Sequence, residues 1–458
     1  MGNFLNNLES LNDKANEIIW GPITLLFILF VGLWFSIKMR FFQILKFKFW
    51  FKSTFGRILA NKSQKTRKDK NKISSFQAVS TALAGCVGTG NIIGVATAIY
   101  FGGPGALFWM WVAAFLGMMT SFAENTLAIK YQEKDKNNNF VGGPMLWMNK
   151  ALNAKWLAYI FAFTAIFVTL GMGNMVQANG IANVLEDSFN VGPLVTGVSL
   201  AIISGTIILG GIQRIVKFTD KIVPIMVVCY TIASFVVLIY HFDKIGPAFY
   251  KILSNAFDFR AVGGSVAGCA AINAMKFGIA RGIFSNEAGL GTAPIIHAIS
   301  HTNEPEKQGM WAIFQVFVDT IVICSATGLS ILVSVDLNKN IQGVHITKEA
   351  FSSVFGQFGA FIVYTTLVLF AFTTILSWSY IGVRSTSYLF GEKSVKFYKI
   401  IACAFIIIGA TAELKFLWNL CDNLNAIMMI PNLISLLLLS REIVKNSKIF
   451  LKAVQKNS

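Results

Sequence analysis

A run of small and polar residues interrupts the apolar segment that follows residue 75. It reads Gly85-Cys86-Val87-Gly88-Thr89-Gly90-Asn91, with glycine at three of seven positions. Glycine weakens helices, so we expect the backbone to leave the helix here and to free N–H and C=O groups. Freed amides at the start of the next half-helix suit a carboxylate, and freed carbonyls suit an ammonium group or a small hard cation. The run therefore predicts a site built from backbone atoms.

A second run of this kind lies further along the chain and comprises Phe277–Gly282 and Phe284–Gly289. Lipid cannot satisfy the backbone groups that a break frees, so a break inside an apolar span persists only beside a cavity or a ligand. Glycines in such spans also serve helix packing, and the pair Gly90 and Gly94 taken alone is typical of that role. Two matched interruptions favour a binding site.

Charged residues inside apolar segments are functional candidates, because burying them in a membrane is costly. Arg281 and Glu287 are six residues apart and so lie on different faces of a regular helix, which means that each needs a partner from another span. We interpret the set as a gate network on the cytoplasmic side, with a purely structural ion-pair network as the alternative. The set consists of Glu124, Arg281, Glu287 and Asp319.

The whole composition places these residues in a lipid bilayer. Apolar residues make up 55% of the 458 residues and charged residues 13%, against roughly a quarter in soluble domains. Apolar runs near the ~20 residues that a membrane helix needs recur along the chain. We expect an all-α polytopic membrane protein with about eleven transmembrane helices. They are predicted at 18–37, 76–101, 105–131, 156–185, 192–210, 219–240, 262–299, 309–335, 358–384, 397–412 and 416–440.

The basic residues give an orientation. The segment 38–72 holds twelve Lys or Arg and one acid, and 30 of the 39 basic residues fall on its side of the membrane if the spans alternate. The positive-inside rule then predicts an external N-terminus and a cytoplasmic C-terminus, and it explains the net charge of +17 without nucleic acid. Residues 41–52 alternate aromatic residues with lysines and predict an amphipathic helix on the inner leaflet.

The two interrupted spans are five spans apart, so they enter the membrane from opposite sides. This is what an inverted repeat of five plus five helices requires, preceded here by one extra helix. The predicted parts are an external N-terminus with the first helix (1–37), a basic amphipathic segment (38–75), two five-helix repeats (76–240 and 241–440) and a basic tail (441–458).

The glycine-rich motifs resemble those of the alanine or glycine:cation symporter family. They are Gly88-Thr89-Gly90-Asn91-Ile92-Ile93-Gly94-Val95-Ala96, Gly102-Gly103-Pro104-Gly105-Ala106-Leu107-Phe108-Trp109-Met110-Trp111 and Arg281-Gly282-Ile283-Phe284-Ser285-Asn286-Glu287-Ala288-Gly289-Leu290-Gly291. The resemblance runs from about Phe76 to Arg441 and implies a LeuT-like fold with sodium- or proton-coupled uptake of alanine or glycine. Ile93 departs from the pattern, where alanine is common.

The resemblance also implies roles at the first break. The amides of Thr89 and Gly90 would bind the substrate carboxylate. Sodium would lie between the carbonyls of Ala84 and Val87 and the hydroxyls of Thr373 and Thr374, since it prefers hard oxygen ligands. The other substrate contacts that we expect are Asn91, Gln177, Gly278 and Trp378. Hydrogen bonding between helices is the alternative for Gln177, and simple packing is the alternative for Trp378.

The expected function is sodium-coupled import of a small neutral amino acid across the plasma membrane of a prokaryote, with proton coupling as the alternative. Neither an HExxH motif nor a GxSxG motif occurs, so an enzyme is disfavoured, and a channel would need a continuous polar pore. A weak metal site at His297 and His301 is the remaining alternative. No obligate protein partner is evident from the sequence.

Overall fold

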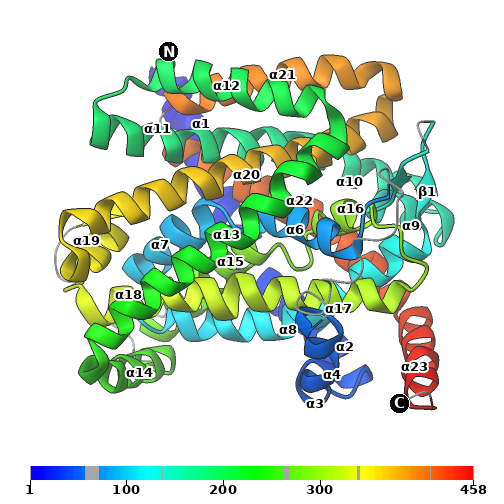
Figure 1. Ribbon diagram of the computed structural model, residues 1–458, viewed down its shortest axis with the longest axis horizontal. Coiled ribbons are helices and arrows are strands. Elements are labelled where there is room, and N and C mark those ends of the chain that lie inside the picture. The colour runs from blue at the N-terminus through cyan, green and yellow to red at the C-terminus, as the bar shows by residue number, and fades with distance from the viewer. Residues whose placement is uncertain are drawn as a thin grey trace.

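The computed structural model describes residues 2–56, 72–136, 138–260, 269–337, 341–412 and 414–456, and it is almost wholly helical (Figure 1). The first half of the chain contains α1 (Gly2–Ile19), α2 (Pro22–Lys38), α3 (Phe42–Leu45), α4 (Phe47–Ser53), α6 (Ser75–Cys86), the π-helical turn η2 (Gly90–Gly94), α7 (Val95–Gly102), α8 (Ala106–Lys130), β1 (Glu133–Lys134), β2 (Phe140–Val141), α9 (Pro144–Lys150), α10 (Lys155–Val168), the π-helical turn η3 (Thr169–Met175), α11 (Val176–Phe189), α12 (Pro193–Leu209) and α13 (Gly211–Tyr240).

The second half adds α14 (Phe242–Ala256), α15 (Ala270–Asn286), α16 (Ala293–His297), α17 (Pro305–Val316), the π-helical turn η5 (Phe317–Cys324), α18 (Ser325–Ser334), α19 (Val344–Phe355), α20 (Gln357–Phe390), the 3₁₀ turn η6 (Glu392–Ser394), α21 (Val395–Thr411), α22 (Leu414–Leu438) and α23 (Ser440–Lys456). β1 and β2 form a small antiparallel hairpin in which Glu133 pairs with Val141.

The prediction of an all-helical membrane protein is confirmed. Among the described residues, eight helices are long and apolar enough to cross a membrane, and the α6–α7 pair, bent by 52°, makes a ninth. α12 is a shorter apolar helix, so the count of eleven stays a prediction. The start of the predicted seventh span and residues 57–71 of the basic segment lie outside the described residues.

The two interrupted helices run side by side in opposite directions. At one end the backbone N–H of His301, just after α16, donates to the carbonyl of Ile73, just before α6, at 2.9 Å. At the other end a Cβ on Gly102, the last residue of α7, would stand 3.0 Å from the Cβ of Phe277 in α15. One half of the membrane domain therefore contains α6 and α16, and the other contains α7 and α15, as inverted repeats require.

The second interruption begins within the later part of the predicted run, Phe284–Gly289, and not at Gly278 or Gly282. α15 is continuous through both residues and ends at Asn286, and Glu287 then takes a left-handed conformation with φ 58°. The glycine at 278 allows close packing, because a Cβ there would stand 2.3 Å from the carbonyl oxygen of Ala106 in α8. The interruption itself spans Glu287–Thr292, before α16 begins.

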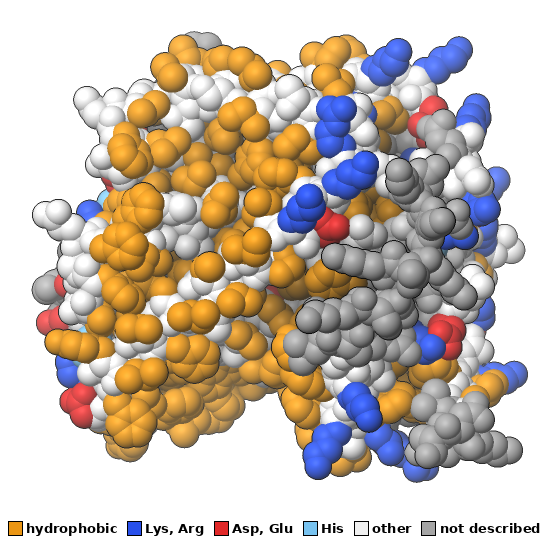
Figure 2. Space-filling model, viewed as in Figure 1, with side chains coloured by type: hydrophobic (Ala, Val, Ile, Leu, Met, Phe, Trp, Pro, Cys, Tyr) orange, Lys and Arg blue, Asp and Glu red, His pale blue; other side chains and the backbone are white. Residues whose placement is uncertain are grey.

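The segment predicted as one amphipathic helix is instead two short ones, α3 and α4, separated at Lys46. Phe42 and Trp50 are buried against the rest of the protein, while Leu45 is exposed. These helices lie at the end of the molecule that also carries β1, α9 and α23 (Figure 1). Lys and Arg side chains gather at that end, and the broad face beside it is hydrophobic (Figure 2).

Candidate functional site

The first break leaves backbone amides that neutral side chains satisfy. Val87 makes the last regular helical bond, with its N–H donating to Leu83 O at 2.7 Å. The next amide, Gly88 N–H, donates to Asn91 Oδ1 at 2.9 Å, and Thr89 N–H donates to Gln177 Oε1 at 3.1 Å. An amide that receives a side-chain oxygen can receive a carboxylate oxygen instead. The structure thus brings Gln177 to the predicted substrate amide.

Two freed carbonyls of the same break and one carbonyl of α20 converge on one hydroxyl. Thr374 Oγ1 lies 3.0 Å from Ala84 O, 3.2 Å from Val87 O and 3.0 Å from Phe370 O, all buried. A hydroxyl has one proton to donate, so it cannot satisfy three carbonyls at once. The surplus of hard oxygens suits a small cation such as sodium.

The adjacent residue Thr373 has different surroundings. Its hydroxyl donates to Phe370 O at 3.0 Å and faces Met226 Sδ of α13 at 4.0 Å. The structure therefore joins Thr373 to the Phe370 carbonyl but not to the break. Its role as a sodium ligand remains a prediction. Sequence reasoning missed Phe370, although a threonine in a helix commonly bonds the carbonyl four residues earlier, which is a usable signal.

Trp378 connects the two breaks. Its indole N–H lies 3.1 Å from Gly85 O in the first break and 2.9 Å from Glu287 Oε1 in the second. The ring is fully buried, and a Cβ on Gly173 would stand 2.4 Å from Trp378 Cβ, so η3 closely covers it. Trp378 therefore lies beside the first break as we expected, with its polar edge directed at the backbone.

A carboxylate holds the second break. Glu124 of α8 accepts hydrogen bonds from Gly289 N at 3.2 Å and Gly291 N at 3.0 Å. Asn432 of α22 donates to the same carboxylate at 2.5 Å and to Gly289 O at 2.9 Å. Glu287 also accepts a bond from Thr292 across the loop. Sequence reasoning missed Asn432, and its spacing from the other residues offers no signal.

Asp319 ties the first break to α15. It lies in η5 and accepts bonds from Asn91 Nδ2 at 2.7 Å and from Ser285 Oγ at 2.8 Å. Asn91 thus has two functions in the structure, since its oxygen receives Gly88 N–H while its nitrogen reaches Asp319. π-helical turns are frequent at functional sites, and η2 and η5 meet here.

Arg281 belongs to another group. It pairs with Asp422 of α22 at 2.7 Å, with side chains 12% and 9% exposed, and its guanidinium lies 5.4 Å from the Phe284 ring centre. Because α15 precedes the second break, Arg281 lies in the half that contains α7. The structure therefore separates Arg281 from the other three predicted gate residues, and the role of all four as a gate remains a prediction. We expected Arg281 to have a partner from another span, and Asp422 is that partner. The sequence did not identify it.

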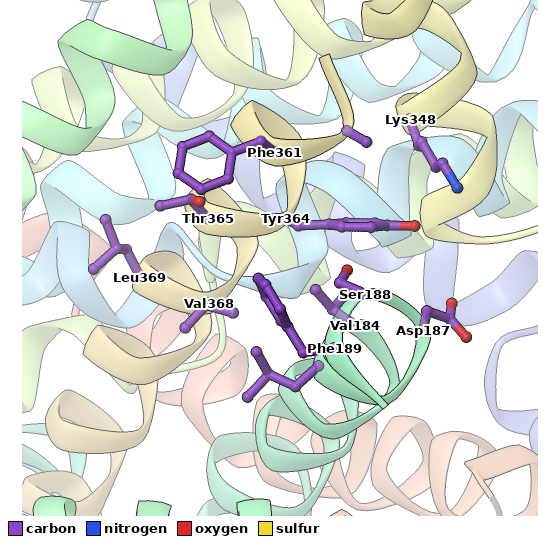
Figure 3. A pocket seen from close by; sticks show the side chains of 12 residues that line it. Val184, Asp187, Ser188, Phe189, Lys348, Phe361, Tyr364, Thr365, Val368 and Leu369 are labelled. Carbon is purple, nitrogen blue, oxygen red and sulfur yellow. The ribbon is translucent and has the colours of Figure 1, made fainter. Parts of the chain in front are cut away.

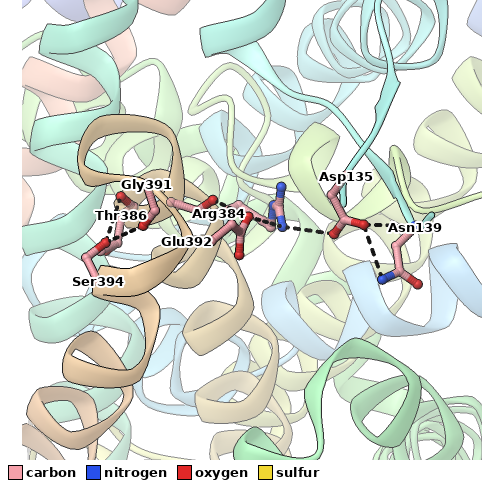
Figure 4. A network of polar contacts seen from close by, with 8 residues as sticks. Asp135, Asn139, Arg384, Thr386, Gly391, Glu392 and Ser394 are labelled. Carbon is pink, nitrogen blue, oxygen red and sulfur yellow. Dashed lines mark hydrogen bonds and ion pairs between the residues drawn. The ribbon is translucent and has the colours of Figure 1, made fainter. Parts of the chain in front are cut away.

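Another ion-pair group lies at the basic end of the molecule (Figure 4). Arg384, in the last part of α20, lies 3.4 Å from Asp135 of the hairpin and 3.7 Å from Glu392. Asp135 also receives the backbone N–H of Asn139 at 3.0 Å. These contacts join the hairpin to the end of the helix that carries Thr374 and Trp378.

Other residues near the site have separate partners. Asn179, two residues after Gln177 in α11, donates to the carbonyls of Gly409 and Ala412, so it joins α11 to α21 and not to the break. Gly278 packs on α8, and its role as a substrate contact remains a prediction.

His297 lies between two glutamines of α17, whereas His301 accepts the Ile73 N–H, and burial lowers the pKa of His301. The two histidines thus have different surroundings, and no cluster of three or more His, Cys, Asp or Glu side chains suited to a metal occurs among the described residues.

Comparisons with known proteins show the family to which the chain belongs. The model of the sodium:alanine symporter family matches residues 5–458. The chain is 42% identical to the sodium/alanine symporter AgcS of Methanococcus maripaludis, covering 98% of both chains. It is 36% identical to the probable sodium/glutamine symporter GlnT of Bacillus subtilis, covering 95% of this chain and 89% of the relative.

Among solved structures, MhsT in complex with L-phenylalanine is similar in fold, with a TM-score of 0.57 at 12% identity over 81% of this chain and 89% of that one. A substrate-bound, outward-open sodium-coupled sialic acid symporter has a TM-score of 0.54 at 11% identity, covering 86% of this chain and 81% of that one. Both likenesses concern the fold alone.

Proposed function

Because this chain belongs to the sodium:alanine symporter family, we propose that it imports a small neutral amino acid, alanine or glycine, together with sodium by alternating access. Family members are transporters, so the chain is a transporter and not an enzyme. It is a multi-pass protein of the cell membrane. The coupling ion that the family supports is sodium.

One observation carries the proposal most directly. Two of the three carbonyls around the Thr374 hydroxyl, those of Ala84 and Val87, belong to the same short break as the Thr89 amide, so a cation and a carboxylate can be bound side by side. We assign the cation to the carbonyl oxygens of Ala84, Val87 and Phe370 and to the hydroxyl of Thr374. The hydroxyl of Thr373 lies next to this set and contacts the Phe370 carbonyl. Proximity of the two ligands lets each stabilise the other through charge attraction, which is a physical basis for coupled uptake.

We propose that the amides of Thr89 and Gly90 bind the substrate carboxylate. The side chains of Asn91, Gln177 and Trp378 would surround the remainder of the substrate. These side chains are at most 2% exposed, so the site is closed to solvent in this conformation. A Cβ on Gly180 would stand 2.8 Å from Thr89 Cγ2, which indicates close packing. Such packing favours a small substrate side chain over that of glutamine.

Two groups of contacts close the site from its two sides. The Arg281–Asp422 pair lies on the α7 side, and the contact between Ile73 and His301 lies on the α6 side. A cavity of about 290 Å³ on the α7 side is lined by Ile93, Gly180 and Asn183, among others, and supports an entrance there. The concentration of basic residues at the opposite end supports an external N-terminus.

The test is uptake of labelled alanine into proteoliposomes under an imposed sodium gradient. We expect accumulation that needs inward sodium, with competition by unlabelled alanine and glycine exceeding that by glutamine. A proton gradient without sodium is the control for proton coupling. If a proton gradient alone drove accumulation equally well, the coupling ion would be the proton and not sodium. If glutamine competed more strongly than alanine and glycine, the substrate would be glutamine.

A further inference from the structure

A cavity of about 440 Å³ lies away from both breaks, between the end of α11, α19 and the first part of α20 (Figure 3). Its lining divides by polarity. Figure 3 shows the Lys348 amine, the Tyr364 hydroxyl and the Asp187 carboxylate extending toward one side, whereas Phe361 and Leu369 lie on the other. The cavity is therefore amphipathic, with a charged end and an apolar end.

The polar end contains a hydroxyl without a partner. Tyr364 is 8% exposed, and its hydroxyl oxygen makes no hydrogen bond to any described residue. Leaving such a group unsatisfied is costly, so an acceptor from a ligand is favoured there. The Lys348 ammonium lies 5.6 Å from the centre of the same ring, so it adds a positive charge beside the free hydroxyl. An anionic headgroup satisfies both groups.

The apolar end continues into a second groove. A cavity of about 380 Å³ on the other side of α20 is lined by Ile225, Cys229 and Ala233 of α13. Phe361, Thr365 and Leu369 line both cavities. These three residues are four apart in a helix, so they form one ridge with a groove on each side. Phe361 is 56% exposed and Ile225 63%, which places both grooves on the hydrophobic outer surface.

We propose that this surface is a specific binding site for a diacyl phospholipid of the surrounding membrane. The phosphate binds Lys348 and the Tyr364 hydroxyl, and one acyl chain lies on each side of the ridge formed by Phe361, Thr365 and Leu369. Two grooves match two chains, and the Lys348 ammonium beside the Tyr364 hydroxyl matches one phosphate. The Asp187 carboxylate at the same end lies 3.3 Å from His345 Nε2. The site is separate from the breaks, so the lipid proposal does not depend on which substrate is transported.

The test measures binding of dioleoyl phosphatidylglycerol to the full-length protein in detergent by native mass spectrometry. We expect Lys348→Gln to weaken binding about fivefold, since a basic residue near a membrane surface contributes about that much attraction to anionic lipid. Tyr364→Phe removes the hydroxyl alone and should weaken binding less. Lys251→Gln is the matched control, because Lys251 is an exposed lysine of α14 outside both cavities.

Two further probes test the headgroup and the second chain. Dioleoylglycerol lacks the phosphate and should bind wild type and Lys348→Gln equally weakly. Ala233→Phe fills the α13 groove and should weaken the two-chain lipid but leave binding of dodecyl phosphate unchanged. Equal retention of phosphatidylglycerol by wild type, Lys348→Gln and Ala233→Phe would overturn the proposal, and so would preferential binding of the single-chain phosphate.

Discussion

The two broken helices free the same kinds of backbone groups and satisfy them in different ways. At the first break, neutral side chains from α11 and α20 take the freed groups, namely Gln177, Thr374 and Trp378. At the second break, the carboxylate of Glu124 takes two amides of the loop. One side chain of α8 therefore satisfies two amides of the second break at once.

This difference separates a reversible site from a permanent support. A ligand can displace a neutral amide or hydroxyl from the first break at small cost, because it makes a similar or stronger bond in exchange. Displacing Glu124 would leave a buried carboxyl group and two buried loop amides without partners, which is more costly. We therefore interpret Glu124 as the support of the second break, and the first break as the place where ligands bind and leave.

The largest effect is expected from removing that support. Glu124→Ala leaves the Gly289 and Gly291 amides unsatisfied, and each costs about 1–3 kcal/mol. We expect a clear fall in the unfolding temperature of the purified protein and loss of alanine uptake. Glu442→Gln is the matched control, because Glu442 pairs with Lys130 at the partly exposed start of α23. A variant that kept its stability and its uptake would show that the second break needs no charged support.

The next effect tests the cation site. Thr374→Val preserves shape and removes the hydroxyl between the Ala84, Val87 and Phe370 carbonyls, so the sodium concentration for half-maximal uptake should rise about tenfold, as expected for a loss of about 1.4 kcal/mol. Thr373→Val should have a smaller effect, since its hydroxyl faces Met226. Thr366→Val, two turns away in α20, is the control. An unchanged sodium response in the Thr373→Val, Thr374→Val double variant would contradict the assignment of the sodium site to this position.

The smallest effect concerns the substrate. Gln177→Leu removes the oxygen that receives Thr89 N–H, and we expect the KM for alanine to change several-fold while the sodium response is retained. Asn179→Ala is the comparison, because its amide joins α11 to α21, so its loss should lower stability and leave the KM unchanged. If the two variants behaved alike in both measurements, Gln177 would be a packing residue and the first break would lack a side-chain substrate contact.

Much of the fold and part of the site follow from the sequence. Apolar length and glycine content predicted the helical membrane class and the position of the first break, because both depend on local backbone preferences. The spacing of two interrupted spans predicted opposite directions for them. Thr374, Gln177 and Trp378 do lie beside the first break, and their roles there remain predictions.

Only the tertiary structure decided which side chain meets which freed group. The Arg281–Asp422 pair and the Glu124–Asn432 bond join residues 141 and 308 positions apart. Such partners depend on how each helix is rotated about its axis when it packs, and no local pattern records that rotation. The same limit applies to the second break. Glycines at 278 and 282 suggested a flexible backbone, yet packing against α8 keeps that helix intact, and the chain departs at Glu287, where Glu124 can satisfy the loop amides of Gly289 and Gly291.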